Sequence, residues 1–116
     1  MEGLDVVREA GATGSTKIVR LKGALTLSTS LLLEEKLSEL RSGDTVIDVT
    51  EVDYIDSSGL GAILSHWAST QRTGHQFAVT GANARVDVLL TVTGLKTVIP
   101  TFKTAEEADA RFMQKA

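Results

Sequence analysis

The stretch TVIDVTEVDYIDSSGLGAIL, residues 45–64, contains the two signals that decide the fold. It begins with the β-branched run Thr45–Val49, which is typical of a buried strand in a parallel sheet. It ends in an apolar pattern with helical spacing, which predicts a helix from about Ser58 to Thr73. The pattern is carried by Leu60, Ile63, Leu64 and Trp67. A strand that leads directly into a helix favours an α/β fold.

The residues before this stretch predict a hairpin and a helix. Leu4–Arg8 and Thr16–Lys22 have the composition and alternation of strands, and the loop EAGATGS between them is rich in small residues. Leucines at helical spacing then predict a helix from about Ser28 or Thr29 to Arg41, with Gly43 as its stop.

The residues after it predict two more strand–helix pairs. Gln76–Thr80 has the pattern of a strand, and a short helix around residues 86–90 is closed by Gly94. Leu95–Ile99, before the chain's single proline, is predicted as a final short strand. Thr104 and Glu107 form a capping-box pattern that opens a last helix near Ala105–Gln114.

The whole pattern predicts one α/β domain spanning residues 1–116. Strands alternate with helices after the hairpin, so we expect a mixed, mostly parallel sheet of four to five strands with an N-terminal β-hairpin and about four helices. The length of 116 residues suits a single core. Because hydrophobic residues make up 42% of the chain and aromatic ones only 4%, that core must be largely aliphatic.

Charge and composition argue against several classes of partner. A net charge of −3 without any run of Lys or Arg disfavours nucleic acid and anionic membranes as partners. The chain has no cysteine, which excludes disulfides and thiolate metal sites, and nothing in it calls for a metal or a cofactor. The N-terminus lacks an apolar signal sequence and no segment is long enough to span a membrane, so we expect a cytoplasmic protein.

The start of the helix after residue 56 carries more reactive groups than a helix end needs. The first N–H groups of a helix lack partners, and Asp56, Ser57 or Ser58 can cap them. Two adjacent hydroxyls exceed that need, and Gly59 and Gly61 each cost about 1 kcal/mol in a helix relative to alanine. Since α/β folds bind ligands at the carboxyl ends of their strands, we expect a functional site here.

A phosphoryl group on Ser57 suits this position. Its oxygens would meet the free N–H groups of the first turn, with Gly59 leaving room for them. It would also add a charge of about −1.5 to −2 beside Asp53 and Asp56, which would repel an acidic or nucleotide-bound partner. Phosphorylation of Ser57 would thereby prevent such a partner from binding to this surface.

Catalytic alternatives are weaker. Ser57, His66 and Asp48 could form a hydrolase triad, but the serine is not in a G-x-S-x-G turn and His66 lies beyond the first helical turn. Asp53 and Asp56 could hold Mg²⁺, but no phosphate-binding loop accompanies them.

Six other residues have structural interpretations. His66 and His75 are predicted as surface or boundary residues, and Trp67 and Phe77 as core residues without an aromatic neighbour for stacking. Arg85 and Asp87 form a solvated turn that could extend a partner's footprint.

The segment VIDVTEVDYIDSSGLGAIL, followed by GLKTVIP at 94–100, resembles the STAS domain of bacterial anti-sigma-factor antagonists. The resemblance covers nearly the whole chain. It implies a non-catalytic regulatory module that binds an anti-sigma factor, which is also a serine kinase, when Ser57 is unphosphorylated. It further implies that phosphorylation of Ser57 releases the kinase, and that a separate serine phosphatase restores the hydroxyl.

The resemblance also implies a role for each residue of the motif. Asp56 would flank the acceptor, Ser58 would cap the helix, Gly59 would let a partner's backbone approach, and Leu60 would anchor the helix to the sheet. Gly61 completes the predicted partner-binding segment of this helix.

The chain departs from the family pattern at residues 23–26. Many antagonists have the acidic segment G-E-L-D there, whereas this chain has GALT, with Ala24 and Thr26 in place of both acids. Thr26 is a candidate partner contact, although a hydroxyl-rich segment before a helix is more often a cap. The departure keeps an alternative open, namely a constitutive STAS adaptor or scaffold subunit in a stress-signalling complex or a membrane lipid or anion transporter.

Overall fold

The computed structural model describes residues 3–12, 14–39 and 43–114. Strands and helices alternate along the chain after an initial pair of strands. In chain order they are β1 (Leu4–Ala10), β2 (Thr16–Leu25), α1 (Leu27–Ser38), β3 (Asp44–Ile55), α2 (Ser57–Thr73), β4 (Phe77–Thr80), α3 (Ala84–Val92), the 3₁₀ helix η1 (Leu95–Thr97), β5 (Thr101–Phe102) and α4 (Ala105–Gln114).

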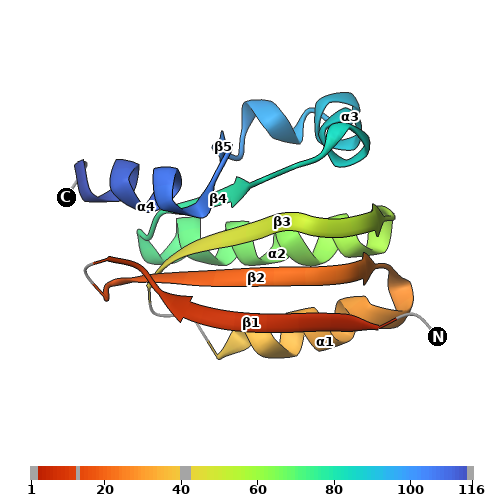
Figure 1. Ribbon diagram of the computed structural model, residues 1–116, viewed down its shortest axis with the longest axis horizontal. Helices are drawn as coiled ribbons and strands as arrows, with labels where there is room; N and C mark the ends of the chain where they lie inside the picture. The colour runs from red at the N-terminus through yellow and green to blue at the C-terminus, as the bar shows by residue number, and fades with distance from the viewer. Residues whose placement is uncertain (1–2, 13, 40–42, 115–116) are drawn as a thin grey trace.

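The five strands form one mixed sheet in the order β1-β2-β3-β4-β5. β1 pairs with β2 in antiparallel orientation, and β2, β3, β4 and β5 are parallel to one another. The predicted mixed, mostly parallel sheet with an N-terminal hairpin and four α-helices is therefore confirmed (Figure 1).

Helices cover the two faces of the sheet unequally. One face carries aliphatic residues such as Val19 and Ile47, which pack beneath α1 and α2 in the larger core cluster. The opposite face carries Ile18, Val46 and Ala78, which pack against α4. Neighbouring residues of β2 and β3 thus enter different cores because strand side chains alternate between faces.

The fold brings the starts of α1 and α2 together at one edge of the sheet. β2 and β3 end side by side, with Leu25 opposite Ile55, and α1 and α2 begin there and run back along the sheet (Figure 1). The Asp56 N–H donates to the Leu25 carbonyl at 3.1 Å. The segment GALT forms the end of β2 and the cap of α1, so it lies directly beside the serine motif.

Several element boundaries differ from the sequence-based expectation. β3 extends from Asp44 to Ile55, well beyond the expected Val49. α1 begins at Leu27 because Thr26 is its N-cap, and its expected end at Arg41 lies outside the described residues. α2 begins one residue earlier than expected, at Ser57.

The strand expected at Leu95–Ile99 is wrong. Gly94, with φ of 79°, turns the chain into η1, and the Leu95 carbonyl accepts from the amides of Val98 and Ile99 at 3.0 and 2.8 Å. These local bonds satisfy the backbone without a strand partner. Sheet pairing begins only at Pro100, whose carbonyl accepts from Val79 N at 3.0 Å, so the edge strand follows the proline.

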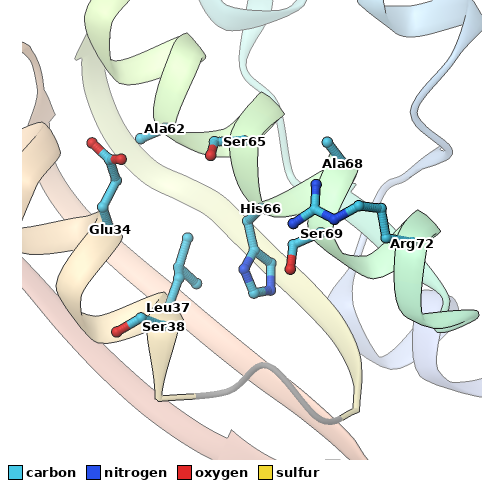
Figure 2. Close-up of a pocket in the computed structure, with 9 residues that line it drawn as sticks. All are labelled: Glu34, Leu37, Ser38, Ala62, Ser65, His66, Ala68, Ser69 and Arg72. Carbon is cyan, nitrogen blue, oxygen red and sulfur yellow. The ribbon is translucent and has the colours of Figure 1, made fainter.

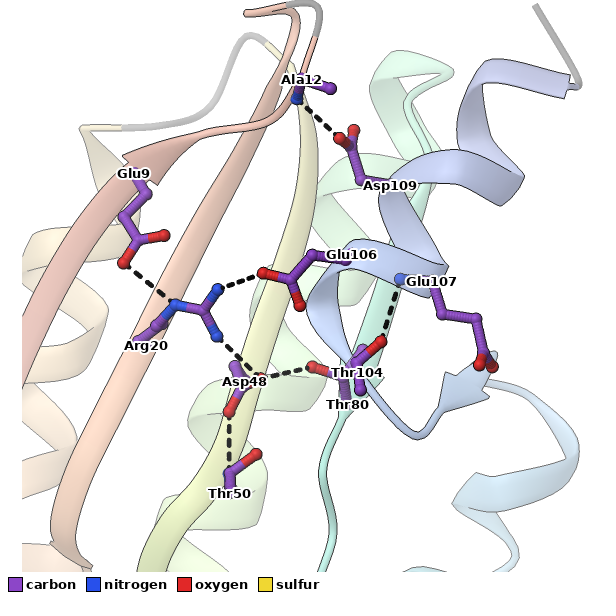
Figure 3. Close-up of polar contacts among 10 residues, drawn as sticks. All are labelled: Glu9, Ala12, Arg20, Asp48, Thr50, Thr80, Thr104, Glu106, Glu107 and Asp109. Atoms are coloured by element: carbon purple, nitrogen blue, oxygen red, sulfur yellow. Dashed lines mark hydrogen bonds and ion pairs between the residues drawn. The ribbon is translucent and has the colours of Figure 1, made fainter.

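A polar network joins the hairpin, the centre of the sheet and α4 (Figure 3). The Arg20 guanidinium donates to Glu9 at 3.0 Å, to Asp48 at 3.2 Å and to Glu106 at 2.8 Å. The hydrogen bond to Glu9 is the main cause that raises the pKa of Arg20. Asp48 also accepts from the Thr80 hydroxyl at 3.1 Å, which accounts for a carboxylate buried within the sheet.

The start of α4 agrees with the sequence-based prediction. Thr104 Oγ1 accepts from Glu107 N at 3.1 Å, which is the capping contact expected from this pair (Figure 3). One turn further on, the buried Asp109 accepts from Ala12 N at 2.7 Å and holds α4 against the β1–β2 loop.

Candidate functional site at the start of helix α2

Asp56 organises the starts of both helices. Its Oδ1 accepts from Gly59 N at 2.9 Å, which makes it the N-cap of α2, and its Oδ2 accepts from Leu27 N at 3.2 Å in the first turn of α1. One carboxylate therefore satisfies an end amide of each helix. The capping role expected of Ser58 belongs to Asp56 instead, because the helix begins one residue earlier than predicted.

Ser57 is the first residue of α2, and its side chain is exposed. Among the residues that the structure describes, none forms a hydrogen bond with its hydroxyl. Ser58 is half-buried and equally without a side-chain hydrogen bond to the described part of the chain. Because Asp56 performs the capping, the Ser57 hydroxyl is left accessible for chemistry from outside.

The two glycines of the motif differ in what surrounds them. Gly59 is buried, and a Cβ atom there would lie 2.7 Å from Leu25 Cγ and in contact with the Leu25 carbonyl. The close approach that Gly59 permits is thus to the end of β2, not to a partner as expected. Gly61 is exposed with open space at its Cβ position, and Leu60 is buried in the core, as its predicted anchoring role requires.

Thr26 acts mainly as part of the α1 cap. Its N–H donates to Thr29 Oγ1 at 2.9 Å, its hydroxyl lies 2.9 Å from Ser28 Oγ, and only 8% of the residue is exposed. The hydroxyl-rich segment therefore serves the start of α1. Ala24, the other position at which this chain lacks the family's acid, is buried beside Tyr54 of β3.

Known proteins resemble this chain in sequence. It is 32% identical over 89 residues to an anti-sigma F factor antagonist of Paenibacillus polymyxa. This match covers 73% of this chain and 76% of that protein. It is 30% identical over 81 residues to an anti-sigma-B factor antagonist of Staphylococcus aureus, covering 67% of this chain and 75% of that protein. A family model described as STAS domain matches residues 8–108.

The chain is a STAS domain protein of the anti-sigma-factor antagonist family. Its fold matches the anti-sigma factor antagonist SpoIIAA in the unphosphorylated form, with a TM-score of 0.80 at 21% identity, over 95% of this chain and 97% of that one. It also matches SpoIIAA of Bacillus in the phosphorylated form, with a TM-score of 0.72 at 20% identity, over 92% and 98% of the two chains.

The elements next to Ser57 carry a set of exposed large apolar side chains that sequence reasoning missed. We call it the leucine patch: Leu27 and Leu31 on α1, exposed by 70% and 75%, and Tyr54 near the end of β3, exposed by 48%. The Asp56–Leu27 hydrogen bond ties this patch to the serine motif. The leucines could have been found from their spacing of four residues, on a face of α1 other than that of Leu33 and Leu37.

The structure excludes the hydrolase triad. His66 is buried, and its Nε2 lies 3.3 Å from Thr45 Oγ1, whereas Asp48 is bound to Arg20 and Thr80. Burial also lowers the pKa of His66. The expectation of a surface or boundary position is thus wrong for His66, because α2 turns this residue toward β3, while His75 is half-buried as expected.

A groove of about 370 Å³ lies between α1 and α2, with His66 pointing into it (Figure 2). It is lined by Glu34 and Ser38 of α1 and by Ser65, Ser69 and Arg72 of α2.

The described part of the STAS domain contains neither a metal-binding cluster nor a membrane-spanning helix. Within residues 3–12, 14–39 and 43–114, no group of three or more His, Asp or Glu could hold a metal ion. No helix in the same part of the chain is both long and apolar enough to cross a membrane.

Proposed function

We propose that this STAS domain is an anti-sigma-factor antagonist that binds an anti-sigma factor with serine-kinase activity while Ser57 is unphosphorylated, and is released when Ser57 is phosphorylated. The observation that carries the proposal is the exposed Ser57 hydroxyl, which has no hydrogen-bond partner among the described residues and lies beside the leucine patch. The names of the relatives in Paenibacillus polymyxa and Staphylococcus aureus support it.

The leucine patch gives a partner something to bind. Exposed apolar side chains that are grouped, unlike single ones, mark protein interaction sites. The burial of each of Leu27 and Leu31 against a partner would contribute roughly 1.5–3 kcal/mol to the binding free energy. Contact with Tyr54, on the β3 side of the motif, would place the partner directly over Ser57.

In the modification step this chain is the substrate. The Ser57 hydroxyl oxygen attacks the γ-phosphorus of ATP held by the kinase, the bond from that phosphorus to the bridging oxygen breaks, ADP leaves, and the hydroxyl proton passes to a base of the kinase. A serine phosphatase reverses the change by hydrolysis. Nothing in this cycle requires catalytic groups on the chain itself, which acts as a binding module, not an enzyme.

The phosphate would change the electrostatics of the patch. Gly59 N already binds Asp56, so the phosphate would find only the free amides at the very start of α2. It would add about −1.5 to −2 charge close to the carboxylates of Asp53 and Asp56. A partner that carries nucleotide phosphates at its docking face would be repelled, which explains release.

The test compares substitutions at two adjacent serines. We expect the native chain and Ser57→Ala to bind the anti-sigma factor encoded in the same genome with similar affinity in calorimetry, and Ser57→Asp to bind about tenfold or more weakly. Ser58→Asp is the matched control, with a much smaller effect. Phosphate transferred from ATP by that partner should be found on Ser57 by mass spectrometry, and not on Ser58 or Ser65.

Equal binding by the native chain and Ser57→Asp, with no phosphate on Ser57, would contradict the switch. Together with retained partner binding, that result would favour the constitutive adaptor.

A further inference from the structure

Most of the aromatic side chains of this protein line one pocket at the far end of α2 from Ser57. The chain has five aromatic residues of the Phe, Tyr and Trp types. Four of them line this aromatic pocket, namely Trp67, Phe77, Phe102 and Phe112. Its volume is about 610 Å³, within the range of about 300–1,000 Å³ that is usual for small-molecule sites.

The shortness of β5 creates the pocket. β5 pairs only with Val79 and Thr80, so the first half of β4, with Phe77, has no strand partner on that side among the described residues. The chain before Pro100 forms η1 and does not extend the sheet. The end of α2 and the last turns of α4 flank the start of β4, at the left in Figure 1.

The four rings differ in burial. Phe77 and Phe112 are buried, by 98% and 95%, and belong to the cores on the two faces of the sheet. Trp67 and Phe102 are only partly buried, so their rings remain available to a ligand. Rings in this arrangement favour a flat apolar body, because offset stacking and edge-to-face contacts add to simple burial.

The pocket contains one positive charge that no carboxylate neutralises. Arg111 Cζ lies 5.7 Å from the centroid of the Phe102 ring, and the guanidinium has no ion pair or hydrogen bond with any described residue. Of the other polar residues that line the pocket, Gln76 donates to Asp44 and to the Phe112 carbonyl, His75 lies 3.6 Å from Asp44, and Gln71 is uncharged. Arg111 is thus the group left to meet an anion.

The charges around the pocket favour a small anion over a large one. α2 and α4 both end at this pocket, and the carboxyl ends of helices carry partial negative charge. A nucleotide polyphosphate would be repelled by these ends and would need more than one cation. A single carboxylate matches the fork of one guanidinium.

We infer that the pocket lined by Trp67, Phe102 and Arg111 binds a small aromatic monocarboxylate, with its ring against the two partly buried aromatic rings and its carboxylate on Arg111. The inference does not rest on the proposed switch. The part of α2 that lines the pocket, from Trp67 to its C-cap Gly74, lies about 15–25 Å from Ser57 along the helix axis.

The test is an NMR titration of the full chain with 2-naphthoate and with its neutral counterpart 2-naphthamide. The chain has one tryptophan, so the single indole N–H signal reports on Trp67 in the pocket wall. We expect saturable shifts with 2-naphthoate at a Kd below about 1 mM. We expect 2-naphthamide to bind about tenfold more weakly, because it lacks the charge.

Substitutions then identify the charge partner. Arg111→Gln should lower the affinity for 2-naphthoate to that for 2-naphthamide and leave the affinity for 2-naphthamide unchanged. Arg111→Lys should keep the preference for the anion. Arg85→Gln, at an exposed arginine outside the pocket, is the matched control and should change neither affinity. Unchanged dispersion of the spectrum shows that each variant is folded.

Absence of a saturable Trp67 shift in the native chain would overturn the inference. Equal affinity for the two probes would overturn it as well, and so would 2-naphthoate binding that Arg111→Gln does not weaken.

Discussion

At the scale of the single residue, neighbouring residues of the serine motif have different structural roles, although they look interchangeable in the sequence. Asp56 caps α2 and also reaches Leu27, which leaves the Ser57 hydroxyl without a structural task. The two glycines, only two residues apart, face opposite surroundings. Sequence reasoning predicted a site at this helix start but misassigned Ser58 and Gly59, because a shift of one residue in the helix start changes which groups point inward.

The two glycines predict opposite effects of the same substitution. Gly59→Ala should lower the free energy of unfolding by about 1–3 kcal/mol, because the added methyl group collides with Leu25. Gly61→Ala should raise it by up to about 1 kcal/mol, because the position is open and alanine favours the helix. Urea unfolding followed by circular dichroism measures both, and equal effects would contradict the packing described for Gly59.

Buried His66 predicts a loss of stability in mild acid. Burial lowers its pKa in the folded chain, whereas in the unfolded chain the pKa is about 6.5. As the pH falls through about 6.5, the unfolded state takes up a proton that the folded state does not, so the free energy of unfolding decreases. His66→Gln should remove this component, in denaturant titrations at about pH 7.5 and 5.5. A pH dependence that survives in His66→Gln would refute this origin.

At the scale of the element, α1 presents leucines both to the core and to the outside. Leu33 and Leu37 are buried against the sheet, while Leu27 and Leu31 are exposed beside the serine motif. The helix was predicted from its leucine spacing, but its start at Leu27 was not, because the cap at Thr26 depends on a contact with Thr29. The edge strand was misplaced because η1 satisfies its own backbone.

Substitutions of two leucines of α1 should separate an effect on stability from an effect on partner binding. Leu33→Ala should destabilise the fold by about 2–5 kcal/mol, since its side chain is completely buried. Leu31→Ala should change stability by less than about 0.5 kcal/mol. The proposed function predicts that Leu31→Ala nevertheless weakens binding of the anti-sigma factor about tenfold. Calorimetry of the complex and urea unfolding measure the two effects, and unaltered binding would remove the leucine patch from the interface.

At the scale of the whole molecule, Arg20 joins parts that are distant in the sequence. Its guanidinium contacts Glu9 of the hairpin, Asp48 of the central strand and Glu106 of α4, as Figure 3 shows. The Asp48 side chain is only 7% exposed, so its charge depends on this partner and on Thr80. On the sheet face that packs against α4, this network joins the hairpin, β3 and α4.

Removing the Arg20 guanidinium should destabilise the fold. Arg20→Gln should lower the free energy of unfolding by about 2–3 kcal/mol, because it leaves the Asp48 carboxylate buried without its cation. Lys22→Gln, which removes an exposed ion pair with Glu51 at 3.8 Å, should cost no more than about 0.5 kcal/mol. Chemical unfolding distinguishes the two, and similar small losses would show that Asp48 does not need Arg20.

The sequence by itself determined the order of strands and helices, the sheet class, the family and the position of the serine motif. Local spacing and end signals encode these features within a few residues of one another. Only the tertiary structure decided that Gly59 packs on Leu25, that Leu27 lies beside Asp56, and that four aromatic rings line one pocket. These depend on contacts between residues far apart in the chain, which no local pattern records.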